Sequence, residues 1–291
     1  MEITLLDGGM GQELIARSDA PATPLWSTDV MRATPDLVRA VHADYFAAGA
    51  QVATANTYAI HRDRLVKAGV EEEFEALHRL ALEQARAARD AHGKGRVAGA
   101  IGPLGASYRP DLQPEHGEAV ARFAEVAALQ APLCDLLICE SVASVAHAKA
   151  ALEGASGHGV PVWIAFTVDD TDGSRLRSGE PLAEAVAACD GAAALLANCS
   201  IPEAMPAALA ELAKAGVPFG AYANGFTEIS AGFLEDSPTV DALTSREDLG
   251  PATYADHVME WVGQGATIIG GCCEVGPAHI AEIARRLESL P

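Results

Sequence analysis

Residues 266–290, which read ATIIGGCCEVGPAHIAEIARRLESL, contain the two patterns that decide the fold of this chain. A short apolar run at 266–272 ends in two glycines and Cys272, Cys273 follows directly, and an amphipathic helical pattern lies at 277–290. The run is apolar at successive positions, as is typical of a parallel strand buried on both faces. The stretch is therefore predicted to be one strand followed by one helix.

Seven similar units precede this stretch along the chain. The predicted strands are 3–9, 51–57, 96–102, 136–141, 161–168, 193–199 and 218–224, and the predicted helices are 35–49, 71–93, 115–129, 141–154, 181–189, 201–216 and 252–265. Pro206 lies inside the predicted helix 201–216, and we expect it in a first turn. Eight alternating pairs favour an α/β fold in which residues 1–291 form a single (β/α)8 TIM barrel, with a doubly wound open sheet as the alternative. The long connections 10–34 and 225–250 are expected to be loops on the active-site face.

The overall charge argues against two classes of partner. The chain has 291 residues and a formal net charge of −20, so it should repel nucleic acid and anionic membrane surfaces. The N-terminus shows no basic region followed by an apolar run, and charges interrupt every apolar stretch before membrane-spanning length. We expect a cytoplasmic protein with small-molecule substrates, as a monomer or a small homo-oligomer.

Polar residues close most of the predicted strands, where barrel enzymes carry their chemistry. In chain order these candidates are Asp7 and Gly8, then Thr54, Asn56 and Tyr58, then Glu140, Cys199, Asn224, Cys272 and Cys273. Glu140 and Asp7 are functional candidates because they are charged groups at a predicted active-site mouth. Asn56 and Asn224 could contact substrate, although a strand-end asparagine often only caps a turn.

Three of the six cysteines should face one barrel mouth. Cys199 closes one predicted strand, and Cys272 and Cys273 close another. Three thiolates with one open position are typical of catalytic zinc, and thiolates favour zinc over magnesium or calcium. Adjacent strand residues point to opposite faces, so both can bind one Zn2+ only if the chain bends, for which Gly270 and Gly271 supply backbone freedom. The other cysteines (Cys134, Cys139 and Cys189) are interpreted as buried thiols, and no disulfide framework is expected.

The chain resembles the homocysteine S-methyltransferase family along essentially its whole length. The specific matching segments are WVGQGATIIGGCCEVGPAHI (261–280), which contains GGCC, and ANCSIPEAM (197–205), which contains the upstream NC, and LLDGGMGQEL (5–14) is supportive. The resemblance implies zinc on the three cysteines at 199, 272 and 273. It also implies homocysteine held by Asp7 and Gly8, with its amino group on Glu140, Thr54 in the site and Tyr58 near the metal. Gln12 departs from the threonine or alanine of many members.

The leading hypothesis is methyl transfer to homocysteine, giving methionine, from a small sulfonium or ammonium donor, with S-methylmethionine preferred. Betaine would require an aromatic cage, to which Trp26, Tyr58, Tyr108, Tyr222 and Phe226 could contribute. Two alternatives remain open: a non-catalytic zinc or thiol-binding barrel, and a homocysteine module that works with a separate folate or cobalamin protein. A metal-dependent hydrolase is disfavoured because the histidines lie mostly in helical patterns, and a Schiff-base enzyme because no lysine closes a strand.

Overall fold

The computed structural model describes residues 2–18, 23, 25, 27–227 and 244–290. Within these residues eight parallel strands form one sheet: β1 Thr4–Leu5, β2 Val52–Thr54, β3 Arg96–Ile101, β4 Leu136–Val142, β5 Val162–Phe166, β6 Ala194–Asn198, β7 Phe219–Tyr222 and β8 Ile268–Ile269. The strand order is β1-β8-β7-β6-β5-β4-β3-β2. A parallel bridge between Leu6 and Val52 joins β1 to β2 and closes the barrel. The predicted barrel is confirmed, although β1 and β8 are shorter than predicted.

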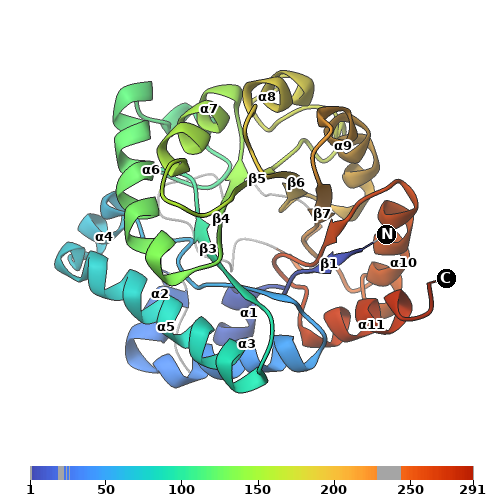
Figure 1. The fold of residues 1–291 in the computed structure, drawn as a ribbon, viewed down its shortest axis with the longest axis horizontal. Helices are drawn as coiled ribbons and strands as arrows, with labels where there is room; N and C mark the ends of the chain where they lie inside the picture. Colours follow the sequence, from blue (N-terminus) through green and yellow to red (C-terminus); the bar gives the residue numbers. More distant parts are fainter. Residues whose placement is uncertain (1, 19–22, 24, 26, 228–243, 291) are drawn as a thin grey trace.

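Helices surround the strands as an outer ring (Figure 1). The helices that follow the predicted pattern are α3 Pro35–Ala47, α5 Phe74–His92, α6 His116–Gln130, α7 Val145–Ala155, α8 Leu182–Ala188, α9 Met205–Leu212, α10 Pro251–Gly263 and α11 Pro277–Leu287. Pro206 lies in the first turn of α9, as expected. Short 3-10 turns adjoin them: η1 Glu71–Glu73, η2 Pro110–Leu112, η3 Ala131–Leu133, η4 Pro202–Ala204 and η5 Ala213–Ala215.

The prediction that 10–34 forms a loop is wrong, because two helices lie within this segment: α1 Met10–Arg17 and α2 Ser27–Ala33. Leu14 of α1 and Met31 of α2 are fully buried, so burial of a few apolar side chains stabilises helices that are too short to show a clear period. A further short helix, α4 Arg62–Ala68, follows β2. Most of the predicted loop 225–250 lies outside the described residues.

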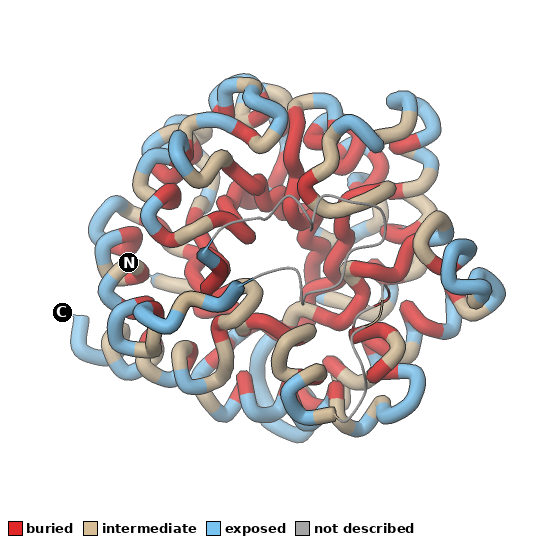
Figure 2. The backbone as a smooth tube through the Cα atoms, turned by 180° about the vertical axis from the view of Figure 1, so that it is seen from behind, coloured by how far each residue is buried: buried red, intermediate tan, exposed pale blue. Residues whose placement is uncertain are grey.

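Alternation along each strand separates two layers of core. On β4, Leu136 and Ile138 point into the barrel and pack with residues such as Trp163, whereas Leu137 and Cys139 pack outward against the helices. Figure 2 shows buried backbone around the barrel centre. Because side chains repeat every two residues, the next inward position on β4 is Glu140. The same strand thus contributes both the apolar interior and a carboxylate at the mouth.

No helix of the described chain is both long and apolar enough to cross a membrane.

Candidate active site

The carboxyl ends of the strands meet around one cavity, where most of the predicted site residues come together. Its lining includes Asp7, Gly8, Thr54, Asn56, Tyr58, Glu140, Cys199, Cys272 and Cys273. Asn224, which was also predicted, is buried but is not part of this lining. The described lining also contains residues that were not predicted for the site, among them Ser27, Ser107 and Ser141, and it contains Tyr108 and Tyr222, which were singled out only as aromatic cage candidates.

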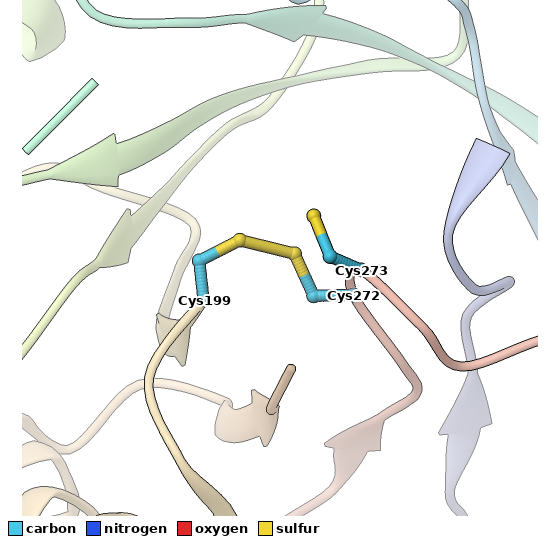
Figure 3. Close-up of side chains that lie close together, drawn as sticks. All are labelled: Cys199, Cys272 and Cys273. Atoms are coloured by element: carbon cyan, nitrogen blue, oxygen red, sulfur yellow. A yellow bond between two sulfur atoms is a disulfide. The ribbon is translucent and has the colours of Figure 1, made fainter. Parts of the chain in front are cut away.

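The three predicted thiols lie together at the mouth, as Figure 3 shows. The Sγ atoms of Cys199, Cys272 and Cys273 all lie within 4.8 Å of one another. Cys199 and Cys272 are joined as a disulfide with their Cα atoms 5.8 Å apart, and Cys273 is a free thiol. This single pair was not predicted from the sequence, and the other four cysteines are free, so no disulfide framework is present among the described residues. Two thiols brought to one point for a shared ligand are also within reach of each other, so the same geometry permits oxidation.

The bend that places Cys272 and Cys273 together occurs after β8 has ended at Ile269. Glycine is required there for close packing and not for an unusual backbone angle. A Cβ atom on Gly271 would lie 2.1 Å from a methyl carbon of Val275, and one on Gly270 would lie 2.6 Å from the Cβ of Leu6. The predicted bend is therefore present, but its physical reason is close packing, against Val275 within the turn and against Leu6, which directly follows β1.

Asp7 is held by two hydrogen bonds from a single residue. The backbone N–H of Thr54 donates to Oδ2 of Asp7 at 2.7 Å, and the Thr54 hydroxyl donates to Oδ1 at 2.8 Å. Burial raises the pKa of the Asp7 carboxyl to about 7, and the bonds from Thr54 act in the opposite direction. Both oxygens are thereby fixed before any substrate binds.

Glu140 faces Tyr222 across the barrel mouth. The Tyr222 hydroxyl donates to Oε1 of Glu140 at 2.8 Å. Burial raises the pKa of Glu140 to about 7, while the hydrogen bond from Tyr222 lowers it. Asp7 and Glu140 are thus two buried carboxyl groups in one cavity, and a cationic group placed there would favour their charged forms.

The hydroxyls of two further tyrosines in the cavity, Tyr58 and Tyr108, have hydrogen-bond partners in the protein. The hydroxyls of Tyr58 and Ser107 are 2.8 Å apart, and the guanidinium of Arg64 lies 5.6 Å from the centre of the Tyr58 ring. The Tyr108 hydroxyl donates to the backbone carbonyl of Cys199 at 3.4 Å. Burial raises the pKa of Tyr58, so its hydroxyl remains protonated at neutral pH.

The two predicted asparagines have protein partners. Oδ1 of Asn56 accepts a 2.5 Å hydrogen bond from the Ser27 hydroxyl, and its amide nitrogen donates to the Ser27 carbonyl at 3.2 Å. Asn56 therefore ties the end of β2 to the start of α2. Oδ1 of Asn224 accepts a hydrogen bond from the backbone N–H of Phe226 at 3.2 Å. Their contact with substrate stays a prediction.

The sulfur cluster has the composition that a thiolate-bound metal requires. Zinc–sulfur bonds of about 2.3 Å place two thiolates on one tetrahedral ion roughly 4 Å apart. The spacing of the three sulfurs fits this requirement once the disulfide is reduced. Cys139, directly before Glu140, instead directs its thiol toward the carbonyl oxygen of Ala151 on α7, at 3.9 Å, and belongs to the outer core.

A parallel barrel with clustered thiols and buried carboxylates at the carboxyl ends of its strands is the architecture of an enzyme that acts on a small polar substrate at the barrel mouth. The sequence model of the homocysteine S-methyltransferase family matches residues 4–287. The chain belongs to this family and is an enzyme of the methyltransferase class.

Individual relatives match over nearly their whole length. The homocysteine S-methyltransferase of Escherichia coli K12 is 34% identical in an alignment 306 positions long, which covers 98% of this chain and 95% of that protein. The crystal structure of the metallated form of the Escherichia coli homocysteine methyltransferase MmuM has a TM-score of 0.83 at 31% identity, covering 98% of this chain and 96% of that one. The oxidised form of the same enzyme has a TM-score of 0.82 at 32% identity with the same coverage.

Proposed function

We propose that this enzyme transfers a methyl group from S-methylmethionine to homocysteine, with zinc bound by Cys199, Cys272 and Cys273. The observation that carries the proposal is the convergence of three sulfurs, from two distant segments, within 4.8 Å. Reduction of the Cys199–Cys272 pair has to precede metal binding, because a disulfide sulfur is not a thiolate ligand. The existence of a metallated form of the E. coli relative supports metal binding in this family.

Zinc would supply the deprotonation of the acceptor thiol at neutral pH, where a free thiol with a pKa of about 8.5 is mostly protonated. The protein's own residues orient the remainder of homocysteine. The carboxylates of Asp7 and Glu140 offer acceptors for the substrate ammonium group. Both carboxyls lie in the same cavity as the sulfurs, and Thr54 and Tyr222 fix their oxygens.

The carboxylate of homocysteine has a site at the beginning of α1. Gly8 and Gly9 precede this helix, and residues 8–12 line the cavity. Backbone N–H groups of a first helical turn have no acceptor within the helix and attract anions. A Cβ on Gly8 would lie 2.0 Å from the carbonyl oxygen of Val275, so only glycine permits this approach of β1 to the cysteine turn.

A sulfonium donor suits the aromatic part of the cavity. Three of the five aromatic residues singled out from the sequence, Tyr58, Tyr108 and Tyr222, line it. Phe226 is not part of the lining, and Trp26 lies outside the described residues. Aromatic faces attract onium cations of either kind. The sulfonium is favoured because it releases a neutral thioether, a better leaving group than the amine released by a quaternary ammonium.

The reaction balances without a further reactant. The acceptor sulfur forms a bond to the methyl carbon, and the bond from that carbon to the donor sulfur breaks. The electron pair of the broken bond stays on the donor sulfur, which leaves as a thioether. The acceptor loses its thiol proton, so homocysteine and S-methylmethionine give two molecules of methionine.

A panel of donors tests the activity. Reduced, zinc-loaded protein is incubated with homocysteine and S-methylmethionine, betaine or a methylated folate, and methionine is detected by mass. Isotope-labelled methyl groups show which donor supplied the product. We expect labelled methionine from S-methylmethionine. Turnover with betaine or the folate alone would replace the proposed donor. A complete absence of product would contradict the proposal and leave the two alternatives, a non-catalytic barrel and a homocysteine module that needs a separate folate or cobalamin protein.

Metal analysis tests the ligands separately from the activity. Cys199→Ser and Cys272→Ser should each lower the zinc content per chain, because each removes one of three thiolates. Cys134→Ser is the matched control, since this half-buried thiol lies outside the cluster and should not change zinc content. Unchanged zinc content in both cluster variants would remove the metal proposal.

A further inference from the structure

Tyr222 is the last residue of β7, and its side chain reaches across the mouth to β4. Both members of the pair are buried, with Tyr222 4% exposed and Glu140 8% exposed. Within the described part of the chain, the Glu140 carboxylate accepts a single hydrogen bond, from the Tyr222 hydroxyl to Oε1 at 2.8 Å. The second carboxylate oxygen, Oε2, is therefore available to a ligand in the cavity.

The backbone of Tyr222 is tied to the sulfur cluster as well. The N–H of Cys199 donates to the carbonyl oxygen of Tyr222 at 3.3 Å, and Asn198 pairs with Tyr222 in the register of β6 and β7. One residue thus contacts a proposed metal ligand through its main chain and a proposed substrate ligand through its side chain. Any displacement of β7 would move both groups together.

Glu140 needs such a partner because its strand is irregular at this point. The register between β4 and β5 shifts between Cys139 and Val142, and Ser141 has a left-handed φ of 55°. Oδ1 of Asn198 accepts the Ser141 N–H at 3.0 Å and supports this backbone. The carboxylate itself can still rotate about its side-chain bonds, and the Tyr222 hydroxyl fixes it.

We propose that Tyr222 is a positioning residue that holds Glu140 with Oε2 directed at the ammonium group of the acceptor. The inference rests on the proposed function, in which Glu140 binds that group. Tyr222 thereby selects amino-acid thiols over thiols of the same length without an amino group. It acts through Glu140 and not on the reacting sulfur.

The test compares homocysteine with 4-mercaptobutanoate, which is homocysteine without its amino group. In Tyr222→Phe the ring remains and one hydroxyl is lost. We expect the ratio of kcat/KM for homocysteine to kcat/KM for 4-mercaptobutanoate to fall roughly ten- to a hundredfold, the effect of losing one hydrogen bond to a charged group. Because Tyr222 also lines the aromatic part of the cavity, any effect of the lost hydroxyl on the donor should change the rates with both acceptors by the same factor and leave this ratio unchanged. A structural role alone would change both acceptors equally.

A double-mutant cycle separates this inference from the proposed function. If Tyr222 acts through Glu140, Glu140→Gln and the double variant should show the same preference between the two acceptors. An intact preference in Glu140→Gln would overturn the proposed ammonium contact and this inference with it. A lost preference in Glu140→Gln but an intact one in Tyr222→Phe would overturn only the role of Tyr222.

Tyr254→Phe is the matched control for loss of a buried hydroxyl. Its hydroxyl donates to the carbonyl oxygens of Ala223 and Gly270, at 3.1 and 2.8 Å, and not to a carboxylate. It should lower the melting temperature and leave the acceptor preference intact. If Tyr222→Phe fails to fold, 3-fluorotyrosine at position 222 keeps the contacts and donates more strongly, so the KM for homocysteine should fall. An unchanged or higher KM there would contradict the inference.

Discussion

Glu140→Gln should stabilise the metal-free, substrate-free protein while it weakens acceptor binding. The glutamine side chain has nearly the shape of a protonated glutamic acid, and its amide oxygen can still accept the hydrogen bond from Tyr222. The wild-type carboxyl has a pKa raised by burial from 4.5 to about 7, so its ionised form is disfavoured in the fold. The substitution removes that ionisation.

The sign and size follow from proton linkage. A carboxyl with a raised folded pKa contributes stability that is fully present below its unfolded pKa of 4.5 and is lost as pH rises through 7. One pKa unit corresponds to about 1.4 kcal/mol, so the free energy of unfolding of the variant should exceed that of the wild type by about 1 kcal/mol at pH 5.5 and about 3 kcal/mol at pH 8. For a chain of 291 residues, the larger difference corresponds to a melting temperature roughly 5 °C higher.

Calorimetric melts of the reduced, chelator-treated proteins at pH 5.5, 6.5 and 8 provide the measurement. Glu83→Gln, which changes an exposed carboxylate on α5, is the control and should show no comparable pH-dependent gain. Added homocysteine should raise the melting temperature of the wild type more than that of Glu140→Gln. A gain that is independent of pH, or a variant less stable than wild type at pH 8, would refute the assignment of a strained, buried carboxylate.

Three further perturbations follow from the same structure. Burial lowers the pKa of four histidines to about 3 or 4: His42, His61, His78 and His147. Below pH 6.5 the unfolded chain therefore takes up protons at these histidines while the folded chain does not. The free energy of unfolding should fall by about 1 kcal/mol per histidine at pH 5.5. Protonation of Asp7 and Glu140 offsets part of this loss. Gly8→Ala should lower zinc content and reduce activity roughly 100-fold, because its Cβ would displace the turn that carries Cys272 and Cys273. Thr54→Val should raise the KM for homocysteine roughly tenfold, because Asp7 would keep only the backbone N–H of its two bonds from Thr54.

Each of these has its own control. Urea melts of His78→Gln should show about one proton less taken up on unfolding at pH 5.5 than wild type, and equal uptake would contradict the histidine assignment. Gly117→Ala, in α6 where an added Cβ meets no atom within 4 Å, should retain zinc and activity. Thr253→Val, on the exposed side of α10, should leave the KM unchanged. An unaltered KM in Thr54→Val would show that Asp7 does not contact the acceptor.

The eight strands were predictable because they read as apolar runs ended by turn residues. A strand of a parallel barrel is buried on both faces, so apolar residues are expected at successive positions. Helices α1 and α2 were not predictable, since each is only two turns long and owes its stability to buried residues such as Leu14 and Met31. Tertiary contacts stabilise the helical conformation of these two segments, and their sequences show no clear helical period of apolar residues.

Strand ends also predicted most of the cavity, but not the pairing of its side chains. The period of two places Asn198 and Tyr222 inward on β6 and β7, so their presence in the cavity follows from the sequence. The hydrogen bond between Tyr222 and Glu140 joins residues 82 positions apart, and the one between Ser27 and Asn56 joins residues 29 positions apart. Neither pairing follows from a local sequence pattern. The disulfide likewise joins residues 73 positions apart, whose proximity only the closed barrel creates.

The polar groups of this cavity are maintained against the preferences of the fold. Each of the four non-glycine residues with left-handed φ in the described chain lies in the cavity lining or next to it: Tyr108, Ser141, Cys199 and Glu274. Such conformations persist only where surrounding contacts impose them, and here Asn198 holds Ser141 while the Tyr222 carbonyl holds Cys199. Glu140 and Asp7 add two carboxyls whose ionised forms the interior disfavours. Strain and buried charge therefore coincide at the mouth, where an incoming ammonium group and a metal cation would relieve the electrostatic part. Substitutions that relieve it without ligands should accordingly stabilise the free protein and impair catalysis together.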